Sequence, residues 1–193
     1  MPSAESTLGQ LRERLLTRLG SAKPFEQLVY RSSTPKYATE TDLITGEGSK
    51  REGGRWNPLG IAVVYASLTP ETALAETLAH NRYYNLPIED AMPRTFVALQ
   101  VKTQCILDLT DGQVRQRLRF SLDAIRTLDW RHEMHLGRKP ITHEIGQAAF
   151  EVGLEGLIVS SAADTKGKNL LIFPANLRPG STVTVLNADQ LKP

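Results

Sequence analysis

Residues 61–71 read IAVVYASLTPE, and this stretch decides the fold class. Its first six residues are apolar and rich in β-branched side chains, which predicts a buried strand. Thr69 and Pro70 have the residue types of a helix N-cap and a first helical position, so a helix is expected from there to about residue 80. A strand followed directly by a helix indicates a protein that mixes both kinds of element.

Further strands and helices are expected on both sides of this stretch. They do not alternate strictly, which favours a single α+β domain over a doubly wound parallel sheet. A polar, glycine-containing stretch at residues 32–57 is expected to be a functional or mobile loop. The expected strands are residues 28–31, 95–101, 105–109, 156–160, 169–173 and 182–186, and the expected helices are residues 121–128 and 142–152.

The N-terminal residues predict one more helix. Leu8, Leu11, Leu15 and Leu19 recur at helical spacing with charged residues between them, and Gly20 is suited to end the helix. Packing of its apolar face on the core is favoured over docking of a partner. We therefore expect residues 1–24 to form an amphipathic helix and linker, and residues 25–193 to form the main domain.

Composition narrows the class of protein. A chain of 193 residues is long enough for one domain with a sizeable core. Its net charge of +2, from 23 basic and 21 acidic side chains, is too small to argue for nucleic acid. The one cysteine, Cys105, lies in an apolar run, which predicts a buried thiol and a reducing compartment. No membrane-spanning run or signal peptide is apparent, so a cytoplasmic location is expected.

Several common catalytic motifs are absent. The sequence has no phosphate-binding loop of the G-x-x-x-x-G-K-[ST] type, no G-x-G-x-x-G after a strand and no G-x-S-x-G. His132 and His135 are one residue too close together for the zinc motif H-E-x-x-H. No metal site is therefore expected, and these histidines are interpreted as surface residues.

Residues 53–60, GGRWNPLG, combine groups suited to a nucleotide. Two glycines allow close approach of a ligand, and the Arg55 guanidinium matches a phosphate. Trp56 and Tyr65 offer flat aromatic faces. A turn between two strands, with Trp56 as a core anchor and Arg55 in solvent, explains the same residues, and on the residues alone it is the simpler interpretation.

Three other polar positions are candidates for a site. Glu76 lies on the expected helix among apolar neighbours, where a carboxylate can stabilise an oxocarbenium-like sugar, although an ordinary helix glutamate explains it equally. Arg31 ends a strand, so it is exposed, paired or facing a ligand. Ser161 has no nearby histidine or lysine to activate it, which favours a hydrogen-bonding role over a nucleophilic one.

The order of these motifs resembles the RES domain family, which is named for an arginine, a glutamate and a serine. The specific part is the glycine–arginine–tryptophan block, followed by Tyr65 and then by Glu76-x-x-x-His80. The chain departs from the family at Ser160, where proline is common, and at Phe150, where tryptophan is common. The matching pieces are Tyr30-Arg31, residues 53–60, 63–67 and 73–80, Asp129-Trp130, residues 142–150 and 156–162, Asn169 and Pro174.

The resemblance implies a fold, an activity and a partner. The fold would be similar to that of ADP-ribosyltransferase toxins, with a mixed or antiparallel sheet flanked by helices. The activity would be cleavage of NAD+ at the nicotinamide–ribose bond by water or inorganic phosphate. No metal would be needed, because nicotinamide leaves as a neutral molecule. The protein would be the toxin of a toxin–antitoxin pair, blocked in a hetero-oligomer by an Xre-type helix-turn-helix antitoxin.

The resemblance also implies roles for individual residues. Arg31, Glu76 and Ser161 would be the catalytic residues. Glu76 would hold a ribose hydroxyl, Tyr65 would stack on nicotinamide, and Ser161 would orient the ribose or carboxamide. The residues implied to bind NAD+ are Arg31, Tyr37, Arg55, Trp56, Tyr65, Ser161 and Asn169.

Two other functions remain open at this point. A transferase that attaches ADP-ribose to a protein would differ only in the acceptor. A non-enzymatic module that binds nucleotide or nucleic acid would use Arg31, Arg55 and the basic residues 115–119. Because few aromatic residues lie near that basic run, a solvated or antitoxin-docking face is favoured, and no nucleic-acid binding is expected.

Overall fold

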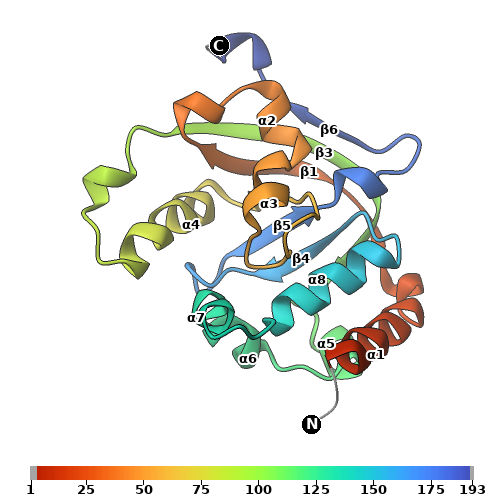
Figure 1. Cartoon of the computed structure of the whole chain (residues 1–193). Helices are drawn as coiled ribbons and strands as arrows, with labels where there is room; N and C mark the ends of the chain where they lie inside the picture. The colour runs from red at the N-terminus through yellow and green to blue at the C-terminus, as the bar shows by residue number, and fades with distance from the viewer. Residues whose placement is uncertain (1–3, 192–193) are drawn as a thin grey trace.

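The computed structural model describes residues 4–191, apart from the side chains of residues 4–6 and of His80. Figure 1 shows the arrangement of its helices around a central sheet. The strands are β1 (Lys23–Ser33), β2 (Val64–Ser67), β3 (Thr95–Asp108), β4 (Gly156–Ser160), β5 (Lys168–Ile172) and β6 (Thr182–Val185). The helices are α1 (Ala4–Leu16), α2 (Glu40–Thr45), α3 (Glu47–Glu52), α4 (Pro70–Tyr83), α5 (Gly112–Leu118), α6 (Leu122–Thr127), α7 (Trp130–His135) and α8 (Ile141–Glu151).

The sheet runs in the order β1-β2-β5-β4-β3-β6, and β1 also pairs with β3. The first five strands therefore close into a ring, with β6 added outside β3. The pair β3–β4 is parallel and the others are antiparallel. A parallel pair needs a long crossover, which the segment carrying α5–α8 supplies. The α+β domain with a mixed sheet flanked by helices, expected from the sequence, is confirmed.

Two apolar clusters hold the layers together. One lies between β4 and the helices α1, α5 and α8, and the other lies among β1, β3, β6 and α2. Leu11 and Leu15 on α1 are buried in the first cluster, so the helix packs on the core as the favoured interpretation had it. Close packing also explains Gly146 on α8, where a Cβ atom would lie 1.7 Å from the Trp56 carbonyl oxygen.

The prediction of a loop at residues 32–57 is wrong over much of that range, because α2 and α3 form there. The Thr39 hydroxyl accepts a hydrogen bond from the Asp42 N–H group and caps α2. Gly46 joins the two helices with φ of +70°, and a Cβ atom there would lie 2.8 Å from the Val63 nitrogen. These helices are short and polar, so their apolar periodicity is too weak to read from the sequence.

Other element boundaries differ from expectation. Residues 95–108 form one long strand, β3, rather than two, because β1 pairs along nearly all of it. The helices α5 and α7 were not expected. The basic run lies largely on α5, where Arg115 donates a hydrogen bond to the Leu109 carbonyl and so helps to hold the helix in place. Cys105 is buried, as expected. Within residues 4–191, no helix is long and apolar enough to cross a membrane.

Candidate active site

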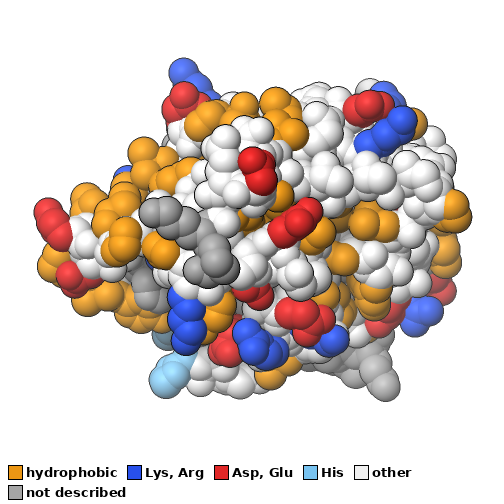
Figure 2. Space-filling model, turned by 90° about the horizontal axis from the view of Figure 1, so that it is seen from above, with side chains coloured by type: hydrophobic (Ala, Val, Ile, Leu, Met, Phe, Trp, Pro, Cys, Tyr) orange, Lys and Arg blue, Asp and Glu red, His pale blue; other side chains and the backbone are white. Residues whose placement is uncertain are grey.

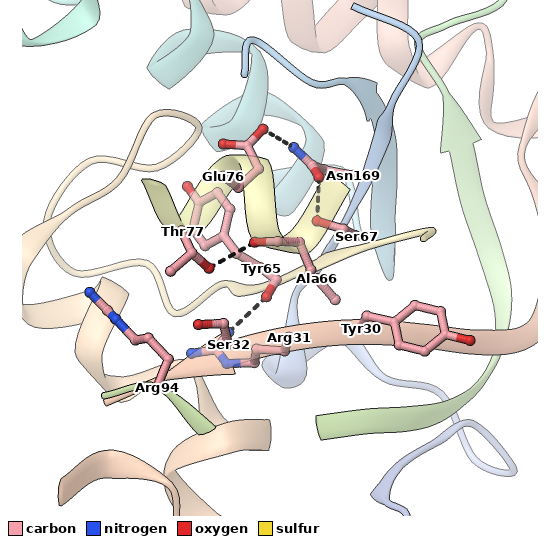
Figure 3. Close-up of a pocket in the computed structure, with 11 residues that line it drawn as sticks. Tyr30, Arg31, Ser32, Tyr65, Ala66, Ser67, Glu76, Thr77, Arg94 and Asn169 are labelled. Carbon is pink, nitrogen blue, oxygen red and sulfur yellow. Dashed lines mark hydrogen bonds between the residues drawn. The ribbon is translucent and has the colours of Figure 1, made fainter. Parts of the chain in front are cut away.

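A cleft of about 460 Å³ opens where β1, β2, β5 and α4 meet. Figure 3 shows the side chains that line it. These elements are far apart in the sequence, and the closed ring of strands brings their ends together. The lining side chains with polar or aromatic groups include Arg31, Tyr65, Glu76, Thr77, Arg94 and Asn169.

Glu76 is the acidic side chain among those lining this cleft. It lies within α4, which begins at Pro70 and is capped by the Thr69 hydroxyl as the sequence predicted. Its Oε1 accepts hydrogen bonds of 2.6 Å from Ser161 Oγ and from Asn169 Nδ2. Asn169 Oδ1 in turn accepts a bond of 2.8 Å from Ser67 Oγ. Among the described side chains, which do not include that of His80, no group donates a hydrogen bond to Glu76 Oε2, so this oxygen is open to a ligand.

Ser161 lies directly after β4 and is completely buried behind Glu76. Its Oγ accepts hydrogen bonds from the N–H groups of Ala163 and Asp164, at 3.0 and 2.9 Å. Because both of those contacts use the oxygen as acceptor, the hydroxyl proton is left to donate to the carboxylate of Glu76. Ser161 is therefore placed to orient Glu76 and is not among the residues that line the cleft.

The turn that carries Ser161 is tied to α4 at a second point. Asp164 Oδ2 accepts a hydrogen bond of 2.7 Å from Thr72 Oγ1, and this bond is the main reason that the pKa of Asp164 is lowered. Gly167 closes the turn, where a Cβ atom would lie 2.4 Å from Thr72 Oγ1. These residues carry no signal in the sequence, since nothing near Thr72 indicates a partner 92 residues away.

Arg31 on β1 faces the cleft from the side opposite α4. Its Nη1 donates a hydrogen bond of 2.9 Å to the Tyr65 carbonyl, while its Nε is buried without a hydrogen-bond partner in the described part of the chain. Burial lowers the pKa of the guanidinium. None of the described carboxylates forms an ion pair with it. A buried cation of this kind is costly unless an anionic ligand approaches it.

Tyr65 lines the cleft, and its hydroxyl is held at the wall by the glycine–arginine–tryptophan block. The hydroxyl donates a hydrogen bond of 2.6 Å to Asn57 Oδ1 and accepts one of 3.0 Å from the Trp56 N–H group. Burial is the main cause of the raised pKa of Tyr65, so the hydroxyl stays protonated. A Cβ atom at Gly54 would lie 2.6 Å from this hydroxyl oxygen. The block therefore positions Tyr65.

Besides Ser161, three other residues expected in the site do not line the cleft. Trp56 is 3% exposed and belongs to the apolar core, in agreement with the anchor interpretation. Tyr37 is 48% exposed on the surface. Arg55 Nη2 donates to the carbonyls of Ile125 and Arg126. Burial lowers the pKa of Arg55, and the nearby Glu76 carboxylate partly offsets this effect.

The cleft also contains a residue that the sequence did not single out. Arg94 stands between the short 3-10 turn Ile88–Ala91 and the start of β3, and it lines the same cleft as Glu76. Nothing in the surrounding residues 92–95, MPRT, distinguishes this arginine from a surface arginine.

Hydrophobic side chains gather beside the cleft, on the connection from α4 to β3. They appear at the left of the molecule in Figure 2. The exposed apolar residues of this segment are Tyr83, Tyr84, Leu86, Ile88, Met92 and Phe96.

His132 and His135 lie exposed on α7. In the described part of the chain, no group of three or more His, Cys, Asp or Glu side chains is arranged to hold a metal ion.

Comparison with known families identifies the chain. A family model described as the RES domain matches residues 28–191. The chain belongs to the RES domain family. The resemblance seen in the sequence is thereby confirmed.

Curated RES-type relatives cover different shares of the chain. The match to the NAD(+) phosphorylase MbcT of Mycobacterium tuberculosis is 25% identical over 142 residues, which are 72% of this chain and 71% of that protein. The Toxin Res of Photorhabdus laumondii is 27% identical over 148 residues, with 76% and 81% covered. The Prs ADP-ribosylating toxin of a Sphingobium strain is 39% identical over 59 residues, with only 31% of this chain and 37% of that toxin covered.

A solved structure shares the RES domain fold. The crystal structure of the M. tuberculosis MbcT–MbcA toxin–antitoxin complex contains a chain that superposes with a TM-score of 0.69. The match covers 94% of this chain and 98% of that one at 22% sequence identity. The likeness supports the α+β architecture at a level of identity where side chains have largely diverged.

Proposed function

We propose that this RES domain protein cleaves NAD+ at the bond between nicotinamide and ribose, as the toxin of a toxin–antitoxin pair. The observation that carries the proposal is the Glu76 carboxylate, held in the cleft by Ser161 and Asn169 with one oxygen open, while a half-buried Arg31 faces the same space. The names of two relatives, an NAD(+) phosphorylase and a Res toxin, agree with it.

The cleft residues suit the parts of NAD+ in the following way. The ring of Tyr65 stacks on the nicotinamide ring, and its locked hydroxyl keeps that ring in a fixed orientation. Arg31 draws the negatively charged phosphates toward the cleft. Ser161 acts through Glu76 rather than on the substrate, because its one hydroxyl proton is already donated to the carboxylate. Asn169 donates one N–H to the same carboxylate and has a second N–H at the cleft.

Glu76 then assists the step that breaks the bond. The electron pair of the bond between ribose C1′ and nitrogen moves to the nicotinamide ring, which leaves neutral, while positive charge develops on the ribose. Glu76 Oε2 accepts a hydrogen bond from a ribose hydroxyl and stabilises this charge electrostatically. An oxygen of water or of inorganic phosphate next bonds to C1′. Water loses a proton and yields ADP-ribose, and phosphate yields ADP-ribose 1-phosphate. The similarity to MbcT, an NAD(+) phosphorylase, favours phosphate as the acceptor.

Product analysis tests this function. Purified protein is incubated with NAD+ with and without inorganic phosphate, and nicotinamide, ADP-ribose and ADP-ribose 1-phosphate are separated by chromatography. We expect nicotinamide release, with the second product set by the presence of phosphate. Intact NAD+ after prolonged incubation in both buffers would overturn the proposal.

Transfer of ADP-ribose to a protein is a second candidate, favoured by the short match to the Prs ADP-ribosylating toxin. The same cleft would serve, with a protein side chain as the acceptor. Incubation with labelled NAD+ and a cell lysate separates the two: a labelled protein band favours transfer, and label confined to small products favours hydrolysis or phosphorolysis.

We further propose that the partner is an Xre-type antitoxin that covers the cleft in a hetero-oligomer in the cytoplasm. The exposed apolar side chains between α4 and β3 support a protein contact there, because such surfaces are commonly covered by partners. The solved relative is likewise named as a toxin–antitoxin complex. Co-expression of the cognate antitoxin should restore growth and suppress NAD+ loss in cells that make this protein. Continued NAD+ loss despite a stable complex would exclude this mode of inhibition.

A further inference from the structure

The pairing of strands β1 and β3 determines the position of Arg94 at the rim of the cleft. In the pairing of β1 with β3, Ser33 lies opposite Thr95 and Ser32 lies opposite Phe96. Arg94 therefore comes at the point where this pairing ends, next to the last residues of β1. Figure 3 shows its side chain at the end of the cleft that is remote from Asn169.

The guanidinium of Arg94 has one nitrogen engaged in a hydrogen bond and two that are available to a ligand. Its Nε donates a hydrogen bond of 2.8 Å to the Ala91 carbonyl, at the end of the 3-10 turn. Among the side chains that the structure describes, none bonds to either Nη atom and no carboxylate pairs with the guanidinium. The planar fork is thus oriented in advance while its charge stays uncompensated. That geometry matches a phosphate group, which accepts two parallel hydrogen bonds from arginine.

The two other arginines expected at the phosphates are placed differently. Arg55 points to the carbonyls of Ile125 and Arg126 and does not line the cleft. Arg31 has one Nη atom engaged with the Tyr65 carbonyl, close to the ring expected to contact nicotinamide. The ionised lining side chains of the cleft are therefore two guanidiniums and one carboxylate, with Arg94 at the outer end. An anion is favoured at that end.

From this arrangement we propose that Arg94 binds the diphosphate of the dinucleotide and selects substrates that carry it over the free riboside. The inference rests on the proposed function and adds a residue that determines specificity. Arg94 acts on binding and is remote from the bond that breaks. Its loss should raise KM for NAD+ and leave kcat nearly unchanged.

A purely structural role makes a different prediction. If Arg94 only caps the 3-10 turn through its bond to Ala91, its replacement lowers stability but affects phosphorylated and unphosphorylated substrates equally. Comparison of NAD+ with nicotinamide riboside, which lacks phosphate, therefore distinguishes the two roles.

The experiment compares Arg94→Ala and Arg94→Lys with the wild type and with Arg82→Ala, a control at an exposed arginine of α4 outside the cleft. For Arg94→Ala we expect KM for NAD+ to rise about 10- to 100-fold, as for loss of a charge-assisted contact, with kcat within about threefold. Turnover of nicotinamide riboside should be unchanged. Arg94→Lys keeps the positive charge but lacks the planar guanidinium. Its KM for NAD+ should lie between those of the wild type and Arg94→Ala. An unchanged KM, or an equal loss for both substrates, overturns the proposal.

A binding measurement keeps this test independent of the proposed reaction. Calorimetric titration with ADP-ribose, which has the diphosphate but no bond to cleave, is made on the same four proteins after their thermal unfolding has been compared. At least tenfold weaker binding by Arg94→Ala supports the diphosphate site even if no NAD+ is consumed. Equal binding of ADP-ribose by folded wild type and folded Arg94→Ala overturns the proposed diphosphate site, whatever the enzyme assay shows.

Discussion

The Ser161 hydroxyl lies 2.6 Å from Glu76 Oε1, although 85 positions separate the two residues in the sequence. Two backbone N–H groups occupy the oxygen of the serine, so its proton has the carboxylate as its acceptor. Ser161 is thus tied to the carboxylate of Glu76 and holds one of its oxygens in place. In the proposed function, this contact lets a serine without an activating base act through the glutamate.

Replacement of this serine tests the relationship directly. In Ser161→Ala, Glu76 keeps only its bond from Asn169, and two partly buried N–H groups lose their acceptor. We expect kcat for nicotinamide release to fall by about one to two orders of magnitude, with a smaller change in KM, and stability to fall by about 1–3 kcal/mol. The matched control is Ser160→Ala, the preceding residue, for which no side-chain hydrogen bond is found within the described chain. Full activity of Ser161→Ala would show that Glu76 needs no such support.

Glu76→Gln removes the charge and keeps the shape of the side chain. Its amide oxygen can still accept from Ser161 and Asn169, so the fold should persist. We expect kcat/KM to fall by about 100- to 1000-fold, because the stabilising charge is lost at the developing cation. The rate of nicotinamide release by Glu76→Gln is compared with the rate of a control variant, Glu71→Gln. That control changes an exposed glutamate in the first turn of the same helix. Comparable losses in the two variants would argue for a general effect on α4.

The ring and the hydroxyl of Tyr65 should contribute to different properties. Tyr65→Phe loses the bonds to Asn57 and to the Trp56 N–H group but keeps the aromatic face in the cleft. Denaturant unfolding should show a loss of about 1–3 kcal/mol, while kcat/KM well below the melting temperature stays within about threefold of the wild type. Tyr65→Leu, which removes the ring, should lose most activity. A large activity loss in a stable Tyr65→Phe protein would assign the hydroxyl to catalysis instead.

His143 on α8 should make stability depend on pH. Its Nε2 lies 2.7 Å from the Gly54 carbonyl oxygen, which can only accept, so the nitrogen carries the proton of the neutral ring. Burial lowers the pKa of His143. The unfolded chain therefore takes up a proton at higher pH than the folded protein. The stabilising contribution is fully present above about pH 6.5 and is lost as the pH falls below that value.

The measurement is the free energy of unfolding between pH 5 and 8 for wild type and for His143→Gln. The variant keeps an N–H donor and cannot titrate, so its stability should depend less on pH over the lower half of this range. Burial raises the pKa of the neighbouring Glu144, whose effect has the opposite sign, and the difference between the two proteins cancels it. Parallel curves would show that His143 is equally protonated in the folded and unfolded states.

Much of the local structure was predictable. The start of α4 at Pro70 and the whole of β4 follow from capping residues and from short apolar runs, which act over a few positions. Arg31 and Glu76 could be chosen because the motif order resembles a known family. Residues 32–57 were misjudged, since the two short helices there depend on the Thr39 cap and on the contact of Gly46 with Val63.

The local sequence therefore determined where most strands and helices lie and which side chains have suitable chemistry. Only the tertiary structure decided which of them share one cleft. Closure of the strand ring places Arg31, Glu76 and Asn169 together and adds Arg94, while it turns Trp56 into the core and Arg55 toward α6. The physical reason is that propensity and capping act between near neighbours, whereas the direction of a side chain depends on strand pairing and packing between residues far apart in the chain.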